Sequence, residues 1–319
     1  MQTTTIIGAG ISGLCTAIVL QEAGYPVCIY TKEKPQATTS AIAAAIWMPF
    51  IAEPREQVNQ WSRRSYEVYA EQAQREPAAG VHMVDFLVLT PTDAPLSWES
   101  AVPAGTVRRA AAAELPPDYQ HGYKVLVPMI ETPIYLRYLL DRYARNGGRI
   151  VQQKIDSLAD FVAKQGLVIN CSGLGAAALC DDEEMYPVQG QIVGVAPMEG
   201  LPYIADDEGP NRLAYVLPRQ DVIILGGTAV VKATSTVPQA AISEAILARC
   251  QRLVPALKEA RILHSKVGLR PARSRIRLEA DPTLNVIHNY GHGGSGYTVS
   301  WGCAETTATL AIERINRSI

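Results

Sequence analysis

The first feature with chemical meaning is a glycine pattern close to the N-terminus. Gly8, Gly10 and Gly13 form a GxGxxG motif between an apolar stretch, residues 3–8, and a segment from residue 11 with helical spacing of apolar residues. In a strand–turn–helix unit these glycines permit a tight turn, the approach of a pyrophosphate, and close helix–strand packing. Free N–H groups at the helix start then receive negative charge. The motif predicts a dinucleotide site, the alternative being a Gly-rich turn that binds nothing.

The ribose partner of such a motif is usually an acidic residue about 20 positions further on. Here the second predicted strand, residues 25–30, is followed by Thr31, Lys32 and Glu33. Glu33 is the nearby carboxylate and lies slightly late, which leaves the ribose contact open. Lys32 is either a phosphate contact or a solvated lysine.

A second Gly-rich loop covers residues 289–298 and contains four glycines within six residues. Such a backbone can pass very close to a flat ligand. We expect a helix over residues 299–315, with Thr298 as its N-cap. The dipole of that helix would stabilise negative charge, such as that at the pyrimidine end of a reduced flavin. Turn chemistry alone is the alternative. Two such loops at opposite ends of one chain favour one extended cofactor, FAD more than NAD.

A third pattern, over residues 267–278, contains four arginines. Arg270 and the apolar Ile276 are six positions apart, so they face the same side of a continuous strand. This predicts an inward-facing guanidinium unless Pro271 breaks the alternation. A buried guanidinium needs a partner, and a carboxylate from the protein or from a substrate is the natural one. The other three arginines alternate with apolar residues and are predicted to form a solvated face: Arg273, Arg275 and Arg277.

Composition narrows the function classes. The chain has 319 residues, 48% hydrophobic and 19% charged, which excludes a disordered or coiled-coil protein. The net charge of −2 gives no electrostatic basis for binding nucleic acid or an anionic membrane. The six cysteines lack metal-ligand spacing, so we expect no metal site and reduced thiols in a cytoplasmic protein. The most apolar stretch, residues 41–52, is far shorter than the ~20 residues that cross a bilayer.

Strand and helix signals at both ends of the chain enclose a region with antiparallel signals. A short polar turn separates two apolar runs, residues 213–217 and 222–225, as in a hairpin. We therefore expect one α/β domain built from separated segments, with a β-rich domain inserted. The other predicted elements are helices over 132–146 and 240–260 and strands over 150–155 and 166–170.

At this point the sequence resembles the D-amino-acid oxidase family. The matching segments span nearly the whole chain in the family's order, and the last two are specific to it. They are IIGAGISGL at 6–14, TTSAIAAAIWMPF at 38–50, VINCSGLGA at 168–176, PVQGQI at 187–192, VGLRPARSRIRLE at 267–279 and HNYGHGGSGYTVSWGCA at 288–304.

The resemblance implies an α/β fold, with a Rossmann-type FAD-binding domain and an inserted, mainly antiparallel β-sheet substrate domain. We assign residues 1–50, 125–185 and 266–319 to the FAD-binding domain, and residues 51–124 and 186–265 to the substrate domain. The implied reaction converts a D-amino acid and O₂ to an imino acid and H₂O₂, by hydride transfer to flavin N5. The imino acid then hydrolyses to a 2-oxo acid and ammonia.

By motif match, Arg270 would bind the substrate carboxylate, Tyr215 would hydrogen-bond the same carboxylate, and the Gly294 carbonyl would accept from the substrate amine. No catalytic histidine is needed, so His292 is interpreted as structural or as tuning the flavin. The FAD-binding residues expected from the motifs and the resemblance are Gly8, Ala9, Gly10, Ile11, Ser12, Gly13, Lys32, Glu33, Thr38, Thr39, Ser40, Ala44, Ala45, Ile155, Ser172, Gly173, Gly293, Gly294, Ser295, Gly296, Tyr297 and Thr298.

Departures from the family pattern bear on the substrate. Ala45 stands where a glycine is common, and Met48 stands where a glutamine is common, which makes the expected pocket more apolar. Residues 206–212 contain no tyrosine for a lid. Related D-aspartate oxidases carry an arginine after Gly-Gly-Thr, and this chain has Ala229. Neutral or apolar D-amino acids are therefore favoured.

Three alternatives stay open at this level. One is another flavin amine oxidase, acting on D-aspartate, glycine or sarcosine. The second is a dehydrogenase of the same fold that uses an acceptor other than O₂. The third is a nicotinamide-dependent Rossmann enzyme or a binding protein without turnover, against which the second Gly-rich loop argues. The chain ends without a peroxisomal signal, which favours a bacterial cytoplasmic member. The sequence leaves a homodimer open.

Overall fold

The computed structural model describes residues 3–317 and divides into two compact units. Within the described residues, unit 1 comprises 3–81, 130–187 and 270–317, and unit 2 comprises 82–129 and 188–269. The two units therefore interleave along the chain. Residues 51–81, which we assigned to the inserted part, belong to unit 1.

Unit 1 is built on a largely parallel sheet. Its strand order is β13–β14–β7–β1–β2–β6, and only the β13–β14 pair is antiparallel. A βαβ crossover explains the start, because β1 and β2 are parallel neighbours joined by a helix. The strand bounds are β1 (Thr4–Ile7), β2 (Val27–Thr31), β6 (Arg149–Gln152), β7 (Val168–Asn170), β13 (Ile262–Ala280, which continues from unit 2) and β14 (Val286–His292).

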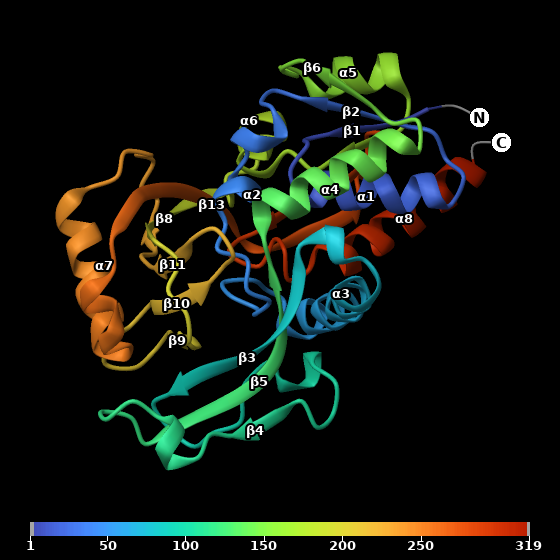
Figure 1. The fold of residues 1–319 in the computed structure, drawn as a ribbon. Coiled ribbons are helices and arrows are strands. Elements are labelled where there is room, and N and C mark those ends of the chain that lie inside the picture. Colours follow the sequence, from blue (N-terminus) through green and yellow to red (C-terminus); the bar gives the residue numbers. More distant parts are fainter. Residues whose placement is uncertain (1–2, 318–319) are drawn as a thin grey trace. The chain divides into compact units, whose positions relative to one another are not determined.

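Helices cover both faces of this sheet (Figure 1). On one face, Phe161 and Val162 of α5 pack with Ile7, Val168 and Val286 of the strands. The other face carries α1, which contacts α4 and α8, and α1 buries eight of its twelve residues. The helix bounds are α1 (Ile11–Glu22), α2 (Thr39–Ile42), α4 (Thr132–Arg145), α5 (Leu158–Gln165), α6 (Ala176–Leu179) and α8 (Ser300–Arg317).

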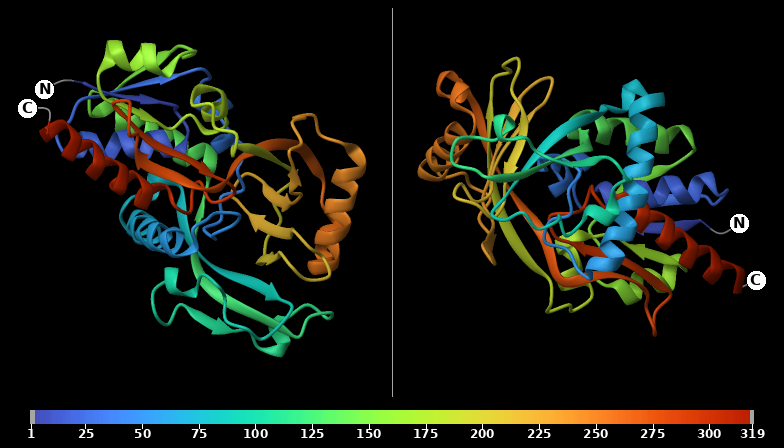
Figure 2. Two further views of the ribbon diagram at one scale, coloured as in Figure 1. Left: turned by 180° about the vertical axis from the view of Figure 1, so that it is seen from behind. Right: turned by 90° about the horizontal axis from the view of Figure 1, so that it is seen from below.

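Helix α3 (Arg55–Arg75) explains why residues 51–81 belong to unit 1. It runs beside α8 in both views of Figure 2. Val58 packs with Val299 and Cys303, and the Trp61 indole N–H donates to Thr306 Oγ1 at 3.1 Å. The helices approach so closely that a Cβ on Gly302 would lie 2.4 Å from the Trp61 carbonyl oxygen.

Unit 2 is a mainly antiparallel sheet, as expected from the sequence. Its order is β4–β5–β3–β9–β10–β11–β8, with β12 paired to β8. The predicted hairpin is confirmed as β10 and β11, which place Tyr215 opposite Gly226. The bounds are β3 (Val81–Thr90), β4 (Val107–Arg109), β5 (His121–Ile130), β8 (Tyr186–Val195), β9 (Tyr203–Asp206), β10 (Ala214–Pro218), β11 (Ile223–Gly226) and β12 (Val230–Val231).

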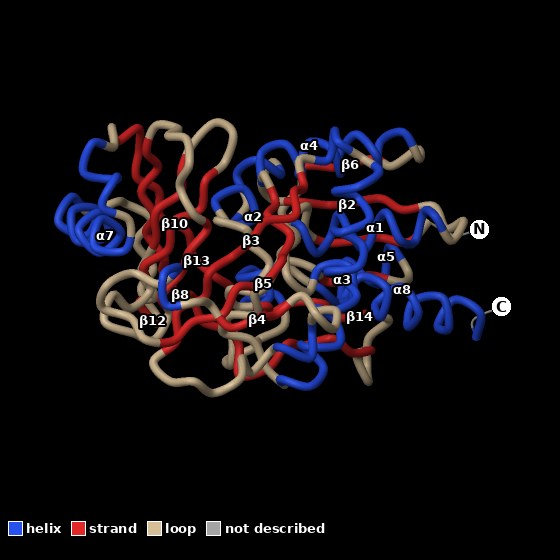
Figure 3. Tube along the Cα trace, turned by 60° about the horizontal axis from the view of Figure 1, so that its bottom comes forward, coloured by secondary structure: helices blue, strands red, loops and turns tan. Residues whose placement is uncertain are grey.

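Helix α7 (Ala240–Leu253) covers one face of the unit 2 sheet, and Figure 3 shows it alongside β10. Its buried residues Ile246 and Cys250 pack with Val193, Val216 and Leu225 of the strands. The helix predicted over 240–260 ends early because Pro255 opens a separate 3₁₀ turn. Within residues 3–317, no helix is both long and apolar enough to cross a membrane.

Candidate cofactor and substrate site

The GxGxxG loop lies at the point where the strand order of unit 1 reverses. β2 and β6 lie on one side of β1, and β7 and β14 lie on the other, so the crevice beyond the end of β1 is a topological switch point. Gly8 has φ +107°, and a Cβ there would lie 2.3 Å from the Cys171 carbonyl oxygen. A Cβ on Gly13 would lie 2.0 Å from the Gly8 carbonyl oxygen. Both positions therefore require glycine, as the motif predicts.

The start of α1 fits a pyrophosphate. Its N-cap is Gly10, which has no side chain to occupy the free amides, and its first turn contains no acidic residue. The Ile11 N–H donates to Ser40 Oγ at 3.0 Å, which brings the predicted segment 38–42 to the helix start. A positive helix end without a carboxylate, beside a hydroxyl, is suited to a phosphate group.

The second Gly-rich loop is tied to residues 48–50 by two buried hydroxyls. Ser295 Oγ accepts from the Phe50 N–H at 2.7 Å and donates to the Phe50 carbonyl at 2.9 Å. Thr298 Oγ1 bonds the Met48 N–H and carbonyl in the same way, at 3.3 and 3.0 Å. The prediction that Thr298 caps the last helix is therefore wrong. Its hydroxyl is committed to Met48, and the helix begins at Ser300.

The same loop contacts both other segments that are predicted to bind FAD. Tyr297 Oη donates to the Ser40 carbonyl at 2.9 Å. A Cβ on Gly296 would lie 3.8 Å from the Ile11 side chain. The Ser12 hydroxyl makes a long contact of 3.4 Å to the Asn289 carbonyl. The structure thus brings together residues of the two Gly-rich loops and of the predicted segment 38–50.

Phe50 brings two of the three predicted substrate residues to one place. A Cβ on Gly294 would lie 2.5 Å from Phe50 Cδ1, and the Arg270 guanidinium carbon lies 5.7 Å from the centroid of the same ring. The neighbouring Gly293 N–H donates to the Pro271 carbonyl at 2.8 Å, which ties the loop to the Arg270 strand. Phe50 itself was not selected from the sequence, although it ends the 38–50 motif.

Ser172 and Gly173 follow shortly after β7, and Ser172 lies next to Gly8, where a Cβ would be 3.3 Å from the Ser172 Cα. Asn170, the last residue of β7, is fully buried, and its Oδ1 accepts from both the N–H and the hydroxyl of Ser172. Asn170 was also missed, although it is the third residue of the VINCSGLGA motif and its polar side chain ends a predicted apolar strand. This end of β7 adjoins the GxGxxG loop, as the motif match implies.

The remaining predicted cofactor residues differ in their exposure and in their contacts within the protein. Lys32 and Glu33 pair with each other at 3.4 Å and are mostly exposed. The Thr38 hydroxyl donates to the Pro35 carbonyl at 2.7 Å, and Thr39 opens α2. Ile155 packs on the α5 core. Ala44 and Ala45 follow α2, and Ala45 has a left-handed φ of +58°. Their contacts with a cofactor stay predictions.

Tyr215 belongs to unit 2 and is described there alone. Its ring lies over Gly226, because a Cβ on that glycine would lie 1.8 Å from Tyr215 Cζ. Nearby in the chain, the segment 206–212, which contains no tyrosine for a lid, begins with a buried residue, Asp206. Asp206 accepts from the Gly209 N–H at 2.5 Å and the Asn211 N–H at 2.8 Å, and also from the Tyr119 hydroxyl. The loop start is therefore fixed by its own carboxylate.

His292 is buried and hydrogen-bonded within the second Gly-rich loop. Its side chain is 5% exposed, and burial lowers its pKa to about 4. Asn289 Nδ2 donates to Thr16 Oγ1 at 3.3 Å, so Asn289 Oδ1 accepts from His292 Nε2 at 2.9 Å. A neutral imidazole holding a loop agrees with the interpretation that it is not a catalytic base.

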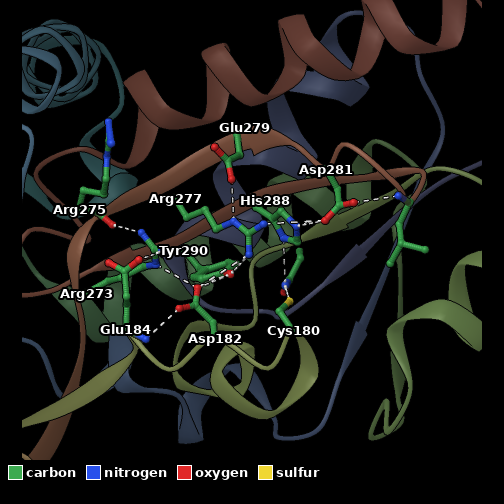
Figure 4. A network of polar contacts seen from close by, with 12 residues as sticks. Cys180, Asp182, Glu184, Arg273, Arg275, Arg277, Glu279, Asp281, His288 and Tyr290 are labelled. Carbon is green, nitrogen blue, oxygen red and sulfur yellow. Dashed lines mark hydrogen bonds and ion pairs between the residues drawn. The ribbon is translucent and has the colours of Figure 1, made fainter.

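The prediction of a solvated face for three arginines is wrong for two of them. Figure 4 shows Arg273 and Arg277 in a polar network, with side chains 12% and 19% exposed. Asp182 accepts from Arg273 Nε at 2.9 Å and from Tyr290 Oη at 2.8 Å. Arg277 Nη1 donates to the same Tyr290 oxygen at 2.8 Å. Only Arg275 of the three has an exposed side chain.

A register irregularity explains this error. The pairing of β13 with β14 shifts between Ala272 and Arg277. Such a bulge interrupts the alternation of faces on which the prediction depended. Asp182, placed by the turn before β8, then provides the carboxylate for the inward arginines. Nothing in the local sequence pattern signals this distant partner.

Comparisons with known proteins identify the family to which the chain belongs. The family model of the FAD dependent oxidoreductase (DAO) family matches residues 3–310. The chain is 42% identical over 311 residues to a D-amino-acid oxidase of Rubrobacter xylanophilus, covering 96% of this chain and 94% of that protein. It is 38% identical over 312 residues to a D-amino-acid oxidase of Streptomyces coelicolor, covering 96% and 95%.

Among solved structures, a glycine oxidase from Geobacillus kaustophilus has a TM-score of 0.83 at 19% identity, covering 98% of this chain and 95% of that one. This likeness shows the fold. The expected α/β fold class, family resemblance and FAD cofactor are confirmed. The chain belongs to the FAD-dependent oxidoreductases of the DAO family.

Proposed function

We propose that the protein oxidises D-amino acids with FAD as its cofactor and O₂ as the final acceptor. In this reaction a D-amino acid, O₂ and water give a 2-oxo acid, ammonia and H₂O₂. Relatives at 42% and 38% identity over nearly their whole length carry the name D-amino-acid oxidase. The observation that carries the proposal is the meeting of Arg270 and Gly294 at the Phe50 ring.

This arrangement suits an α-amino acid, which carries a carboxylate and an amine on one carbon. The Arg270 guanidinium supplies a planar pair of donors for the carboxylate. The Gly294 carbonyl supplies an acceptor for the amine. The Phe50 ring beneath Arg270 holds the cation by stacking and gives an apolar wall, which strengthens its attraction for a carboxylate.

The cofactor residues have separate tasks. Bound FAD supplies the two-electron acceptor that no side chain of the protein can provide. The N-terminus of α1 and Ser40 receive the pyrophosphate, and the loop of residues 291–298 provides a close-packed backbone for the flat ring. Catalysis by the protein is then positioning and electrostatics, without a titrating base.

Tyr215 is proposed as a second carboxylate ligand through its hydroxyl. Its ring orientation is determined by Gly226, against which it packs. Neutral or apolar D-amino acids are the proposed substrates, because Ala229 follows Gly226-Gly227-Thr228 where acid-specific relatives carry an arginine. Cytoplasmic residence is also proposed, and the six free cysteines support it. A homodimer is a further proposal, tested by light scattering.

The decisive experiment is an anaerobic titration of the purified yellow protein. D-Alanine should bleach the flavin absorbance, and L-alanine should leave it unchanged. Admission of air should restore the absorbance and release H₂O₂. A panel containing D-aspartate, glycine and sarcosine then defines the substrate. Turnover on one of those three with none on neutral D-amino acids would refute the substrate proposal. Dye reduction without H₂O₂ would refute O₂ as the acceptor.

Arg270→Ala tests the carboxylate assignment. Loss of a desolvated ion pair costs about 2–5 kcal/mol, so kcat/KM should fall between about 30-fold and several thousand-fold. The decrease should come mainly from KM, and FAD should stay bound. Arg275→Ala, on the same strand with an exposed side chain, is the matched control and should behave as wild type. Tyr215→Phe should be milder, at about 1 kcal/mol. Normal KM in Arg270→Ala would contradict the assignment.

A further inference from the structure

Helix α7 places an arginine against the backbone of the hairpin that carries Tyr215. Arg249 is half-buried, and its Nη2 donates to the carbonyl of Gly227 at 2.7 Å. Gly227 is buried and lies one residue beyond the end of β11, so its carbonyl is outside the ladder with β10 and needs another donor. The donor carries a full positive charge, which makes this bond stronger than a neutral hydrogen bond.

The rest of the guanidinium shows that this bond determines the conformation of the side chain. Arg249 Nε is buried and, among residues 3–317, has no hydrogen-bond partner. A buried donor without a partner destabilises the folded state. The side chain nevertheless keeps Nη2 on the Gly227 carbonyl. That carbonyl is therefore the polar group that holds Arg249 in place.

The backbone that Arg249 holds is the surface on which the Tyr215 ring lies. Tyr215 is paired with Gly226 across the hairpin. A Cβ on Gly226 would lie 1.8 Å from Tyr215 Cζ, and a Cβ on Gly227 would lie 3.1 Å from Cε1 and 3.3 Å from Oη. The phenol is thus packed directly against these two glycines, and a shift of the Gly227 backbone would move its hydroxyl.

Arg249 acts from the side of the sheet opposite to the Tyr215 ring. Val216, the next residue in β10, packs with Ile246 of α7. Side chains alternate between the two faces along a strand, so the Tyr215 side chain points away from α7. A ligand of the Tyr215 hydroxyl therefore lies on the face away from α7, and Arg249 influences it through the Gly227 backbone.

We propose that Arg249 is a positioning residue for Tyr215, which fixes the backbone beneath the phenol so that the hydroxyl is in place when the substrate carboxylate binds. This inference rests on the proposed role of Tyr215 as a carboxylate ligand. A group that is held in its binding geometry loses little conformational freedom on binding, which raises the affinity for the ligand. Without the Arg249 bond, part of that contribution of Tyr215 is lost.

The test measures binding of propionate, which is alanine without its amino group, to the FAD-saturated protein by the change in flavin absorbance. Arg249→Met keeps a long apolar side chain and removes the donor. It should weaken propionate binding about three- to fivefold, and Tyr215→Phe about fivefold. The double variant should bind like Tyr215→Phe alone, because both changes remove the same hydrogen bond. Arg249→Lys keeps a donor for Gly227 and should recover most of the affinity.

Arg252 provides the matched control on the same helix. Its Nε donates to Asn211 Oδ1 at 2.5 Å, in the turn before β10 and not in the backbone beneath the phenol. Arg252→Met removes an equal charge and should bind propionate like the wild type. A flavin absorbance spectrum equal to wild type confirms that each variant folds and holds FAD. Arg249→Gln, whose shorter side chain also lacks the charge, replaces Arg249→Met if that variant fails this check.

Turnover provides a second measurement. In Arg249→Met the KM for D-alanine should rise in parallel with the loss of propionate affinity, and kcat should change less than KM. A loss that persists in full in the Tyr215→Phe background, or an equal loss in Arg252→Met, would show an effect of charge or of helix packing and overturn the inference. Wild-type affinity in Arg249→Met, with the expected loss in Tyr215→Phe, would overturn it and leave the proposed function intact. Wild-type affinity in Tyr215→Phe would refute the carboxylate role of Tyr215 and this inference with it.

Discussion

Acidification should destabilise the protein through His292. Its imidazole is 5% exposed and donates through Nε2 to Asn289 Oδ1. Burial is the cause that lowers its pKa to about 4, against an ordinary value of 6.5. A base with a lowered folded pKa binds fewer protons in the folded state than in the unfolded state. Its stabilising effect is complete above pH 6.5 and is lost as the pH falls toward 4.

The size of the effect follows from the two pKa values. They differ by 6.5 − 4, about 2.5, which corresponds to a limit of about 3 kcal/mol. At pH 5 the unfolded imidazole is almost fully protonated and the folded one is mostly neutral. The free energy of unfolding should therefore be lower at pH 5 than at pH 7 by about 2 kcal/mol from this residue alone.

Urea unfolding of the FAD-saturated protein at pH 5 and pH 7 measures this loss. His292→Gln keeps an N–H donor for Asn289 and removes the titration, so its loss between the two pH values should be about 2 kcal/mol smaller than that of the wild type. His288, whose pKa burial also lowers, is present in both proteins and cancels from the comparison. An equal pH dependence in the two proteins would show that His292 is not held neutral by burial.

Two further substitutions test the packing of unit 1. Asp182→Ala should lower the free energy of unfolding by about 3–5 kcal/mol in urea. It removes the buried carboxylate that Arg273 and the Tyr290 hydroxyl share, and it leaves Arg273 with the exposed Glu184 alone. A loss below 1 kcal/mol would mean that this network is solvated. Ala45→Gly relieves about 1–2 kcal/mol of left-handed backbone strain in the folded state. Glycine also costs about 0.5–1 kcal/mol more conformational entropy on folding, so the net effect should be a slightly higher Tm. A lower Tm would contradict the assigned backbone conformation.

The sequence predicts those parts of the site at which the local backbone geometry permits a single residue type. Gly8 and Gly13 are required by contacts at 2.3 and 2.0 Å that no Cβ could occupy. Gly293 is required in the same way, with φ +55° and a Cβ position 2.0 Å from the Ile51 carbonyl oxygen. Such steric constraints require glycine at these positions, and the glycine pattern is visible in the sequence without knowledge of the fold.

The long helix α3 could not be predicted from apolar periodicity because its buried face is largely polar. Ser62 and Ser65 are fully buried there, together with Tyr69. Ser65 Oγ accepts from the Trp301 N–H at 3.1 Å, so a small hydroxyl residue lets α8 approach closely. A face of serine and tyrosine has no strong apolar repeat, and the N-cap residue Pro54 makes no side-chain cap hydrogen bond. The assignment of residues 51–81 to the inserted domain follows from this missed helix, whereas residues 125–129 and 266–269, assigned to the FAD-binding domain, lie in strands of unit 2.

The contacts of the same helix explain why residues 51–81 belong to unit 1. Tyr69 is fully buried, and its hydroxyl lies 3.1 Å from the Tyr297 carbonyl and 2.9 Å from Ser300 Oγ. Tyr297 in turn bonds the Ser40 carbonyl, and Ser40 bonds the first amide of α1. A loop with four glycines has high conformational entropy when free, so holding it in one conformation requires fixed contacts. Helix α3 provides such contacts through Tyr69. This is why its segment of the chain belongs to unit 1 together with the loop.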